Sequence, residues 1–241
     1  MNARRVGAYL VHIYTASTMA LLALSAHLLF LGRYDAALAA MLLAIVIDST
    51  DGFLARRVDI KIALPEFDGR RMDDVIDYVS YVFMPVLFLL QTNMLLGPEL
   101  LWATVPLMAS VFGFGRVDAK LDEEGFFLGF PSYWNIVVFY CFVFALPPWL
   151  NTLIIAVLAI LVFVPMRYMY ITRLSSLRWL NYSLTLAWAV LIGAALLTAG
   201  QLRSVLLTLS LVFPIYYTAG SFLLDRRARL RADLRPSLGR S

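Results

Sequence analysis

An apolar run that leads into two aspartates sets the fold class of this chain: Ala40-Met41-Leu42-Leu43-Ala44-Ile45-Val46-Ile47-Asp48-Ser49-Thr50-Asp51. The eight residues before Asp48 are all apolar, which predicts a helix in an apolar environment. A carboxylate near the middle of a bilayer costs about 2.5–3.5 kcal/mol on insertion scales. Because that cost disfavours acids without a role, Asp48 and Asp51 are predicted to belong to a functional site.

The composition of the whole chain indicates a membrane protein. Of its 241 residues, 61% are hydrophobic and 15% are charged, whereas soluble domains average about 45–50% apolar and about 25% charged. So much apolar material excludes intrinsic disorder. The single cysteine, Cys141, excludes a disulfide scaffold. With a formal net charge of +4, the basic residues are better read as topology signals than as a nucleic-acid surface.

Apolar segments long enough to cross a bilayer, which takes about 20 residues, recur between charged or Pro/Gly-containing breaks. We predict an all-α polytopic membrane protein of about eight transmembrane helices. The shortest predicted helices are the fourth and the fifth. The predicted spans are approximately 9–31, 36–55, 73–96, 99–115, 131–147, 149–166, 179–199 and 202–224.

The positive charges orient these spans. Of the 20 Lys and Arg residues, only Arg33 and Arg203 fall at the predicted outside turns. Since cytoplasmic loops carry the excess of Lys and Arg, both termini are predicted to lie inside. Residues 1–224 are expected to form one integral-membrane catalytic domain, and residues 225–241 a basic cytoplasmic tail.

The acids are predicted to lie on matched faces of two neighbouring helices. Spacings of i, i+3, i+4 and i+7 place one set on a shared helix face, namely Asp48, Asp51, Gly52 and Ala55. Spacings of four residues do the same for Gly69, Asp73 and Asp77. The connecting loop makes the two helices antiparallel, so four carboxylates should converge near the cytoplasmic surface.

Carboxylates that converge repel one another unless a positive charge lies between them. Oxygen ligands without His or Cys suit Mg²⁺, Mn²⁺ or Ca²⁺, and paired divalent ions commonly assist displacement at phosphorus. The alternative is a structural ion-pair cluster of Asp73 and Asp74 with Arg70 and Arg71. That alternative is favoured for Asp74 alone, because Asp74 lies off the shared face.

Together these residues resemble the signature of the CDP-alcohol phosphotransferase family, D-x2-D-G-x2-A-R followed by G-x3-D-x3-D. The defined positions are occupied here by Asp48, Asp51, Gly52, Ala55, Arg56, Gly69, Asp73 and Asp77. Twelve residues separate Arg56 from Gly69, a longer spacer than is usual, and this resembles the bacterial phosphatidylcholine synthase branch. Two further runs are similar to that branch, Gly129-Phe130-Pro131-Ser132-Tyr133-Trp134-Asn135 and Tyr78-Val79-Ser80-Tyr81-Val82-Phe83-Met84-Pro85.

The resemblance implies an enzyme that transfers the phosphatidyl group of CDP-diacylglycerol to choline and releases CMP. It implies two divalent ions, Mn²⁺ or Mg²⁺, held by Asp48, Asp51, Asp73 and Asp77. Asp77 is also the expected catalytic base. Donor binding is expected at Gly52, Ala55, Arg56 and Gly69. The resemblance further implies a homodimer in the bacterial inner membrane, with the active site facing the cytoplasm.

A choline acceptor requires aromatic residues, because its quaternary ammonium donates no hydrogen bond. Each aromatic face is worth about 0.5–2 kcal/mol to such a cation. The candidates near cytoplasmic span ends are Tyr133, Trp134, Tyr168 and Tyr78, with Tyr81 and Tyr170 beside them. The ordinary interpretation of any one of them is a residue of the interfacial aromatic belt.

Several alternatives remain at the level of sequence. The same chemistry could serve serine, inositol or glycerol phosphate as the acceptor. A cation transporter would explain intramembrane acids but not the Gly/Ala/Arg spacing, and an inactive scaffold would not need the complete acid set. His12 and His27 are expected to be structural, since they lie too far apart along one helix to form a metal site.

Overall fold

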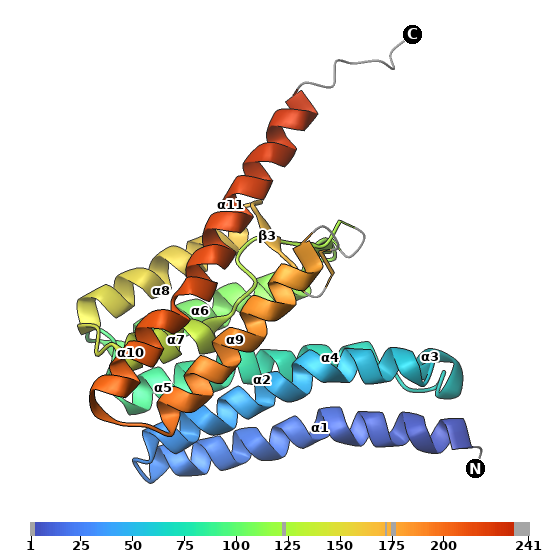
Figure 1. The fold of residues 1–241 in the computed structure, drawn as a ribbon, viewed down its shortest axis with the longest axis horizontal. Coiled ribbons are helices and arrows are strands. Elements are labelled where there is room, and N and C mark those ends of the chain that lie inside the picture. The colour runs from blue at the N-terminus through green and yellow to red at the C-terminus, as the bar shows by residue number, and fades with distance from the viewer. Residues whose placement is uncertain (1–2, 122–123, 172, 175–176, 234–241) are drawn as a thin grey trace. The chain divides into compact units, whose positions relative to one another are not determined.

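The computed structural model describes residues 3–121, 124–171, 173–174 and 177–233, and helices make up most of them (Figure 1). These residues form two compact units. The first unit contains the described residues up to Phe114 together with Ser132–Ala156. The second contains Gly115–Pro131 and the described residues from Val157 onward.

The first unit is organised around two long antiparallel helices, α1 (Ala3–Phe30) and α2 (Tyr34–Arg57). They lie side by side in Figure 1 and are joined by a turn in which Gly32 has a positive φ of 70°. Ser25 on α1 donates a hydrogen bond of 2.9 Å to the carbonyl of Ala37 on α2. The other elements of this unit are α3 (Ile60–Ala63), α4 (Gly69–Asp77), η1 (Tyr78–Phe83), α5 (Met84–Gln91), α6 (Glu99–Gly115), α7 (Trp134–Val143) and the first part of α8 (Pro148–Phe163).

The helix that follows the long loop is continuous from Gly69 to Gln91, through α4, the π-helical η1 and α5. The carboxylate of Asp68 caps its start by accepting a hydrogen bond from the backbone N–H of Arg71 (3.2 Å). Aromatic packing holds the far part of this helix, where the rings of Phe88 and Phe142 meet edge to face at 5.0 Å. The acids of α4 are therefore carried on a supported element.

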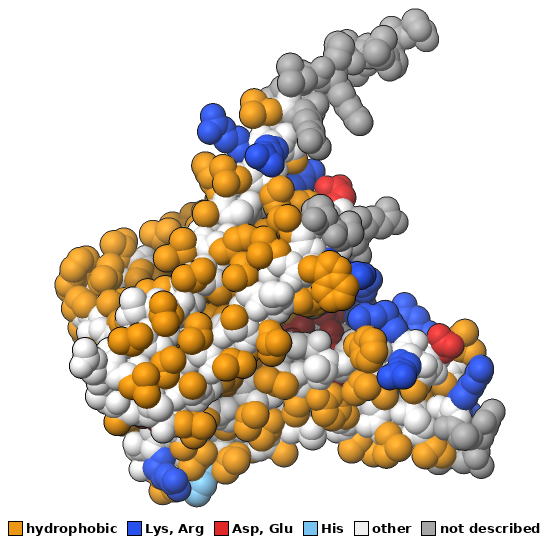
Figure 2. All heavy atoms as spheres, viewed as in Figure 1, with side chains coloured by type: hydrophobic (Ala, Val, Ile, Leu, Met, Phe, Trp, Pro, Cys, Tyr) orange, Lys and Arg blue, Asp and Glu red, His pale blue; other side chains and the backbone are white. Residues whose placement is uncertain are grey.

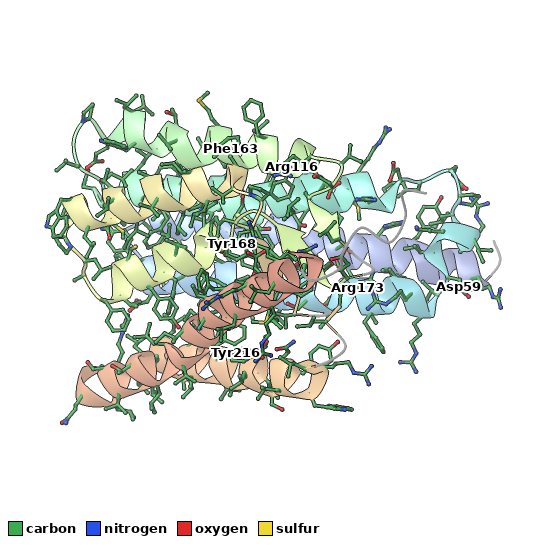
Figure 3. All side chains as sticks on the ribbon, turned by 90° about the horizontal axis from the view of Figure 1, so that it is seen from above. Asp59, Arg116, Phe163, Tyr168, Arg173 and Tyr216 are labelled. Atoms are coloured by element: carbon green, nitrogen blue, oxygen red, sulfur yellow. The ribbon has the colours of Figure 1, made fainter. Side chains whose placement is uncertain are left out.

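The second unit joins a small antiparallel sheet to the C-terminal helices. The sheet has the order β1-β2-β3, from β1 (Lys120–Leu121), β2 (Phe126–Leu128) and β3 (Arg167–Met169). The helices are α9 (Arg178–Leu196), α10 (Gly200–Ser210) and α11 (Val212–Asp233). Tyr216 on α11 donates a hydrogen bond of 2.7 Å to Asn181 on α9 (Figure 3).

The far edge of β3 is covered by α11 instead of by a fourth strand. The backbone N–H groups of Arg167 and Met169 donate to the side chains of Asp225 (3.1 Å) and Ser221 (3.0 Å). These two acceptors stand one turn apart on α11, so they match the two-residue repeat of the strand. A side chain on Gly220 would meet Met169 at 2.9 Å, which shows how closely the helix approaches the strand.

The structure agrees with a protein embedded in a membrane. Among the described residues, four helical stretches are long and apolar enough to cross a bilayer: Arg4–Phe30, Tyr34–Arg57, Arg178–Leu196 and Gly200–Leu230. Hydrophobic side chains cover much of the face seen in Figure 2. Ile13, Met108 and Leu186 are each more than 60% exposed. Outward apolar faces are expected where lipid is the solvent, so the chain is an integral membrane protein.

The small sheet was not expected from the sequence, because strands of two or three residues are too short to show alternation. Helix α11 includes the first part of the predicted basic tail and ends at Asp233, and residues 234–241 lie outside the described residues. The assignment of residues 225–241 to a cytoplasmic tail stays a prediction. The eight-span count and the inside location of both termini stay predictions.

Candidate metal site

The signature acids come together in the first unit. Carboxylate oxygens of Asp48, Asp51 and Asp73 all lie within 4.8 Å of one another, and so do those of a second group, Asp73, Asp74 and Asp77. Asp73 belongs to both groups, so the acids form one continuous cluster between α2 and α4. The convergence predicted from the helical spacing is therefore present. Asp74, interpreted from its spacing as a structural ion-pair residue, also contributes a carboxylate to the second group.

The cluster is shielded from solvent without being closed. Asp51 is buried, with 7% of its surface exposed, while the other four acids are partly buried. Asp48 stands about 13 Å before the end of α2, from a rise of about 1.5 Å per residue. Carboxylates that are partly or fully buried stabilise a cation strongly, because the protein interior screens charge less than water does.

Two hydroxyl groups from other elements hold the carboxylates of α2. Thr15 on α1 donates a hydrogen bond of 2.9 Å to Asp51 Oδ2. Tyr81 in η1 donates one of 2.5 Å to Asp48 Oδ2. Donors of this kind orient the ligands of a metal and tune their basicity. Neither contact was predicted from the sequence.

The sequence carries a signal for one of these two residues and not for the other. Tyr81 continues the four-residue spacing of Gly69, Asp73 and Asp77, so the helical repeat alone places it on the acidic face. Thr15 gives no such signal. It approaches Asp51 from a separate helix, 36 positions away in sequence, and local periodicity does not report contacts between helices.

The donor set of the cluster fits a hard divalent cation. Every ligand it offers is a carboxylate oxygen, the type preferred by Mg²⁺, Mn²⁺ and Ca²⁺. The second group shares Asp73 with the first, so the acids form one cluster and not two separate ones. Like charges so close together are stabilised when a cation lies between them. The acidic groups can therefore bind metal.

Two glycines of the signature lie close to side chains of other residues. A Cβ added to Gly52 would meet Arg56 Nη1 at 3.3 Å, so this glycine makes room for the exposed guanidinium one turn later. A Cβ on Gly69 would stand 2.8 Å from Cε1 of His12 on α1. Ala55 is partly exposed on α2. Gly52 and Gly69 thus each permit a close approach by another side chain.

The aromatic candidates for the acceptor separate into different environments. Tyr133, at the N-cap of α7, lies with its ring centroid 5.7 Å from that of Tyr81. Trp134 is fully buried, and its indole Nε1 donates to Ser110 Oγ at 2.7 Å. Tyr78 donates to the carbonyl of Leu107 at 2.9 Å.

Tyr168 belongs to the second unit. It lies on β3, where it is 4% exposed (Figure 3). Burial raises the pKa of its phenol to about 12, and the charge of Asp225 adds to the rise, so this hydroxyl stays protonated at neutral pH. Among these candidates, Tyr133 is the one whose ring meets that of Tyr81, the residue that donates to Asp48, and part of its surface is exposed.

Comparison with known proteins identifies the family. A phosphatidylcholine synthase from Pseudomonas aeruginosa is 37% identical over 204 residues, which cover 84% of this chain and 84% of the relative. One from Legionella bozemanae is 43% identical over 148 residues, 60% of this chain and 67% of the relative. One from Legionella pneumophila is 37% identical over 175 residues, 70% and 67% respectively.

This chain belongs to the phosphatidylcholine synthase family. No family model matches it. Membership of the phosphatidylcholine synthase family confirms the resemblance predicted from the signature, and with it the expectation of a membrane-embedded transferase. The acids that carried the prediction are the ones that the fold gathers into a single cluster.

Proposed function

We propose that this protein makes phosphatidylcholine, by transferring the phosphatidyl group of CDP-diacylglycerol to choline with release of CMP. One observation carries the proposal: a chain of the phosphatidylcholine synthase family gathers the carboxylates of Asp48, Asp51 and Asp73 within 4.8 Å of one another, with Asp77 in the adjoining group. Such a cluster suits a reaction in which negative charge builds up on a diphosphate.

Four aspartates hold the metal in this proposal: Asp48, Asp51, Asp73 and Asp77. Two divalent ions bound there, Mn²⁺ or Mg²⁺, would neutralise the diphosphate of the donor and favour the departure of CMP. Thr15 and Tyr81 keep the carboxylates of α2 in position through their hydrogen bonds.

The reaction needs a base for the choline hydroxyl, and Asp77 is the proposed one. Its carboxylate accepts the proton as the choline oxygen forms a bond to the phosphorus that carries diacylglycerol. The bond from that phosphorus to the bridging oxygen of CMP breaks, and the electron pair leaves with CMP. A base positioned in this way typically contributes about 10²–10⁴-fold in rate.

The donor is proposed to lie along the small residues of the signature, near Gly52, Ala55, Arg56 and Gly69. Arg56 is exposed over Gly52, and a guanidinium in that position suits a phosphate oxygen. The acyl chains of the donor can stay in the bilayer while its headgroup reaches the acids.

The orientation proposed for the site is cytoplasmic, in the inner membrane of a bacterium. Basic side chains gather at the end of the first unit that holds α3 and the start of α1 (Figure 2), where Arg5 also forms an ion pair with Glu66. A surplus of Arg and Lys marks the cytoplasmic side of membrane proteins. A homodimer is proposed from the family resemblance alone.

The direct test supplies purified protein with CDP-diacylglycerol, Mn²⁺ and one labelled alcohol at a time: choline, serine, inositol or glycerol phosphate. We expect CMP release and labelled lipid with choline, and loss of both after chelation of the metal, with recovery when Mn²⁺ or Mg²⁺ is restored. Lipid product from serine but not from choline would contradict the proposed acceptor. Cation movement across sealed vesicles without CMP release would indicate a transporter instead.

A further inference from the structure

Two tyrosine rings meet at the border of the acid cluster. Tyr81 in η1 and Tyr133 at the start of α7 have ring centroids 5.7 Å apart and ring planes inclined at 48°. Both side chains are partly exposed. Tyr81 follows Asp77 by one helical turn, and its hydroxyl reaches Asp48 at 2.5 Å. The aromatic pair is thus tied directly to the acids that hold the metal in the proposed reaction.

The ring of Tyr81 is fixed in place by its surroundings. Its hydroxyl is bound to Asp48, and its backbone lies in the π-helical segment Tyr78–Phe83. Turns of the π-helix are rare and often coincide with functional sites, because the extra residue redirects side chains relative to an α-helix. A change in the position of Asp48 would therefore also move the aromatic surface.

The residues before and after Tyr133 hold its ring in position. Ser132 before it is buried and has a positive φ of 58°, a backbone conformation uncommon outside glycine. Trp134 after it is fully buried, donates through Nε1 to Ser110 (2.7 Å), and donates its backbone N–H to the carbonyl of Ser132 (2.8 Å). Trp134 thus supports Tyr133 from the core, while Tyr133 keeps part of its surface exposed.

Two fixed and partly exposed tyrosine rings suit the binding of a quaternary ammonium ion. Such a cation donates no hydrogen bond and is attracted by aromatic faces within about 6 Å. The hydroxyl of Tyr81 is bound to Asp48, so the faces of the ring, and not its polar atom, are what Tyr81 can offer to a cation. A metal ion, which needs oxygen ligands directly, is served by the carboxylates themselves.

We propose that Tyr81 and Tyr133 bind the quaternary ammonium of the acceptor and so present its hydroxyl to Asp77. Two carbon atoms separate nitrogen from oxygen in choline, so an ammonium held at the Tyr81 ring keeps the hydroxyl on the same helix face as Asp77, one turn before Tyr81. Trp134 is fully buried, and the ring of Tyr78 packs edge to face against Phe114 at 5.8 Å, so neither ring belongs to this pair. This proposal rests on the proposed function and adds the residues that select the acceptor.

The first experiment compares leucine substitutions on one helix in purified, lipid-reconstituted protein. Tyr133→Leu is expected to raise KM for choline by about 3- to 30-fold, which is the loss of affinity expected when one aromatic face is removed. KM for CDP-diacylglycerol should change little. Tyr140→Leu, two turns further along α7, is the matched control and should leave both constants near their original values. Tyr133→Phe keeps the ring and should restore most of the affinity lost in Tyr133→Leu.

A second measurement needs no variant and so does not depend on folding. Tetramethylammonium should inhibit the original protein competitively with choline. The rate should also fall along the acceptor series choline, dimethylethanolamine, ethanolamine, since added N–H groups raise the cost of leaving water. Equal use of ethanolamine and choline, or equal KM for choline in the two leucine variants, would overturn the aromatic site. If the original protein makes no lipid from choline, the proposed function itself fails.

Discussion

The imidazole ring of His12 occupies the space that a side chain at residue 69 would need. A Cβ on Gly69 would stand 2.8 Å from Cε1 of His12, and the same ring packs at 4.3 Å against Phe67. His12 is buried, with 9% of its surface exposed. Since Gly69 is the first residue of α4, this contact brings the start of α4 close against α1, and Asp73 follows one turn later.

The contact predicts the outcome of a substitution at the signature glycine. Gly69→Ala should displace His12 or the start of α4 and destabilise the protein by about 1–3 kcal/mol, as overpacking usually does. It should also reduce choline-dependent CMP release, because Asp73 moves with the helix. The measurements are melting temperature in detergent and the rate of CMP release.

A double variant separates crowding from a direct role of Gly69 in donor binding. Replacing His12 with alanine in the Gly69→Ala background provides space for the new methyl group. The two substitutions should then cost less together than the sum of their separate effects, as expected for residues in contact. Strict additivity in both stability and rate would show that the crowding by His12 is not what makes glycine necessary.

The hydroxyl of Thr15 should matter through the metal. Thr15→Val removes the 2.9 Å hydrogen bond to Asp51 with little change of shape, and groups that orient metal ligands are typically worth about 10–100-fold in metal affinity or activity. We expect a higher Mn²⁺ concentration for half-maximal activity and partial recovery when Mn²⁺ is in excess. Titration of the rate with Mn²⁺ measures this directly.

Thr18 provides a matched control on the same helix. It is also buried, at 1% exposure, and its hydroxyl has no hydrogen-bond partner among the described residues. Thr18→Val therefore removes the same atom without removing an interaction with the acids. If both variants required the same Mn²⁺ concentration as the original protein, Thr15 would have no role in positioning Asp51.

The acid cluster could be predicted from sequence because its geometry is mostly helical geometry. Spacings of three and four residues are sufficient to place Asp48 with Asp51 and Asp73 with Asp77, and the intervening loop then brings the helices together. The contact with Thr15 could not be predicted in this way. It depends on the rotation of α1 about its own axis, which tertiary packing decides.

The small sheet is a second feature that could not be predicted from the sequence. Its strands are two or three residues long and pair across the chain, with Phe127 opposite Tyr168. Segments this short show no detectable alternation. Gly129, on the same connection, has a φ of 87° and would clash with the carbonyl of Val162 at 2.2 Å if it had a side chain. Only the folded structure reveals why glycine is needed there.

Asp77 and Asp74 should respond differently to neutralisation. If Asp77 is the base, Asp77→Asn should lower the rate by about 10²–10⁴-fold, and excess metal should not restore it. Asp74→Asn removes a carboxylate from the second group but no proposed proton acceptor, so any loss should be smaller and should diminish with added metal. Single-turnover CMP release at several Mn²⁺ concentrations distinguishes the two cases. Full recovery of Asp77→Asn by metal would assign Asp77 to metal binding alone.

Asp225 should stabilise the second unit without entering the reaction. Its carboxylate accepts the N–H of Arg167 (3.1 Å) and the guanidinium of Arg229 (2.7 Å), and it is 6% exposed. Asp225→Ala leaves the β3 backbone donor unsatisfied in a buried place, at a cost of about 1–3 kcal/mol. We expect a lower melting temperature in detergent and an unchanged KM for choline.

The exposed ion pair of Arg116 with Asp118 serves as the control for the buried carboxylate of Asp225. The hydrogen bond from Arg116 lowers the pKa of Asp118, so any stabilisation is present at neutral pH and is lost as the pH falls through that lowered value. Exposed pairs contribute little because water screens them. Asp118→Ala should therefore leave the melting temperature unchanged at pH 7. If Asp225→Ala also left the melting temperature unchanged, the hydrogen bonds from β3 to α11 would not stabilise this unit.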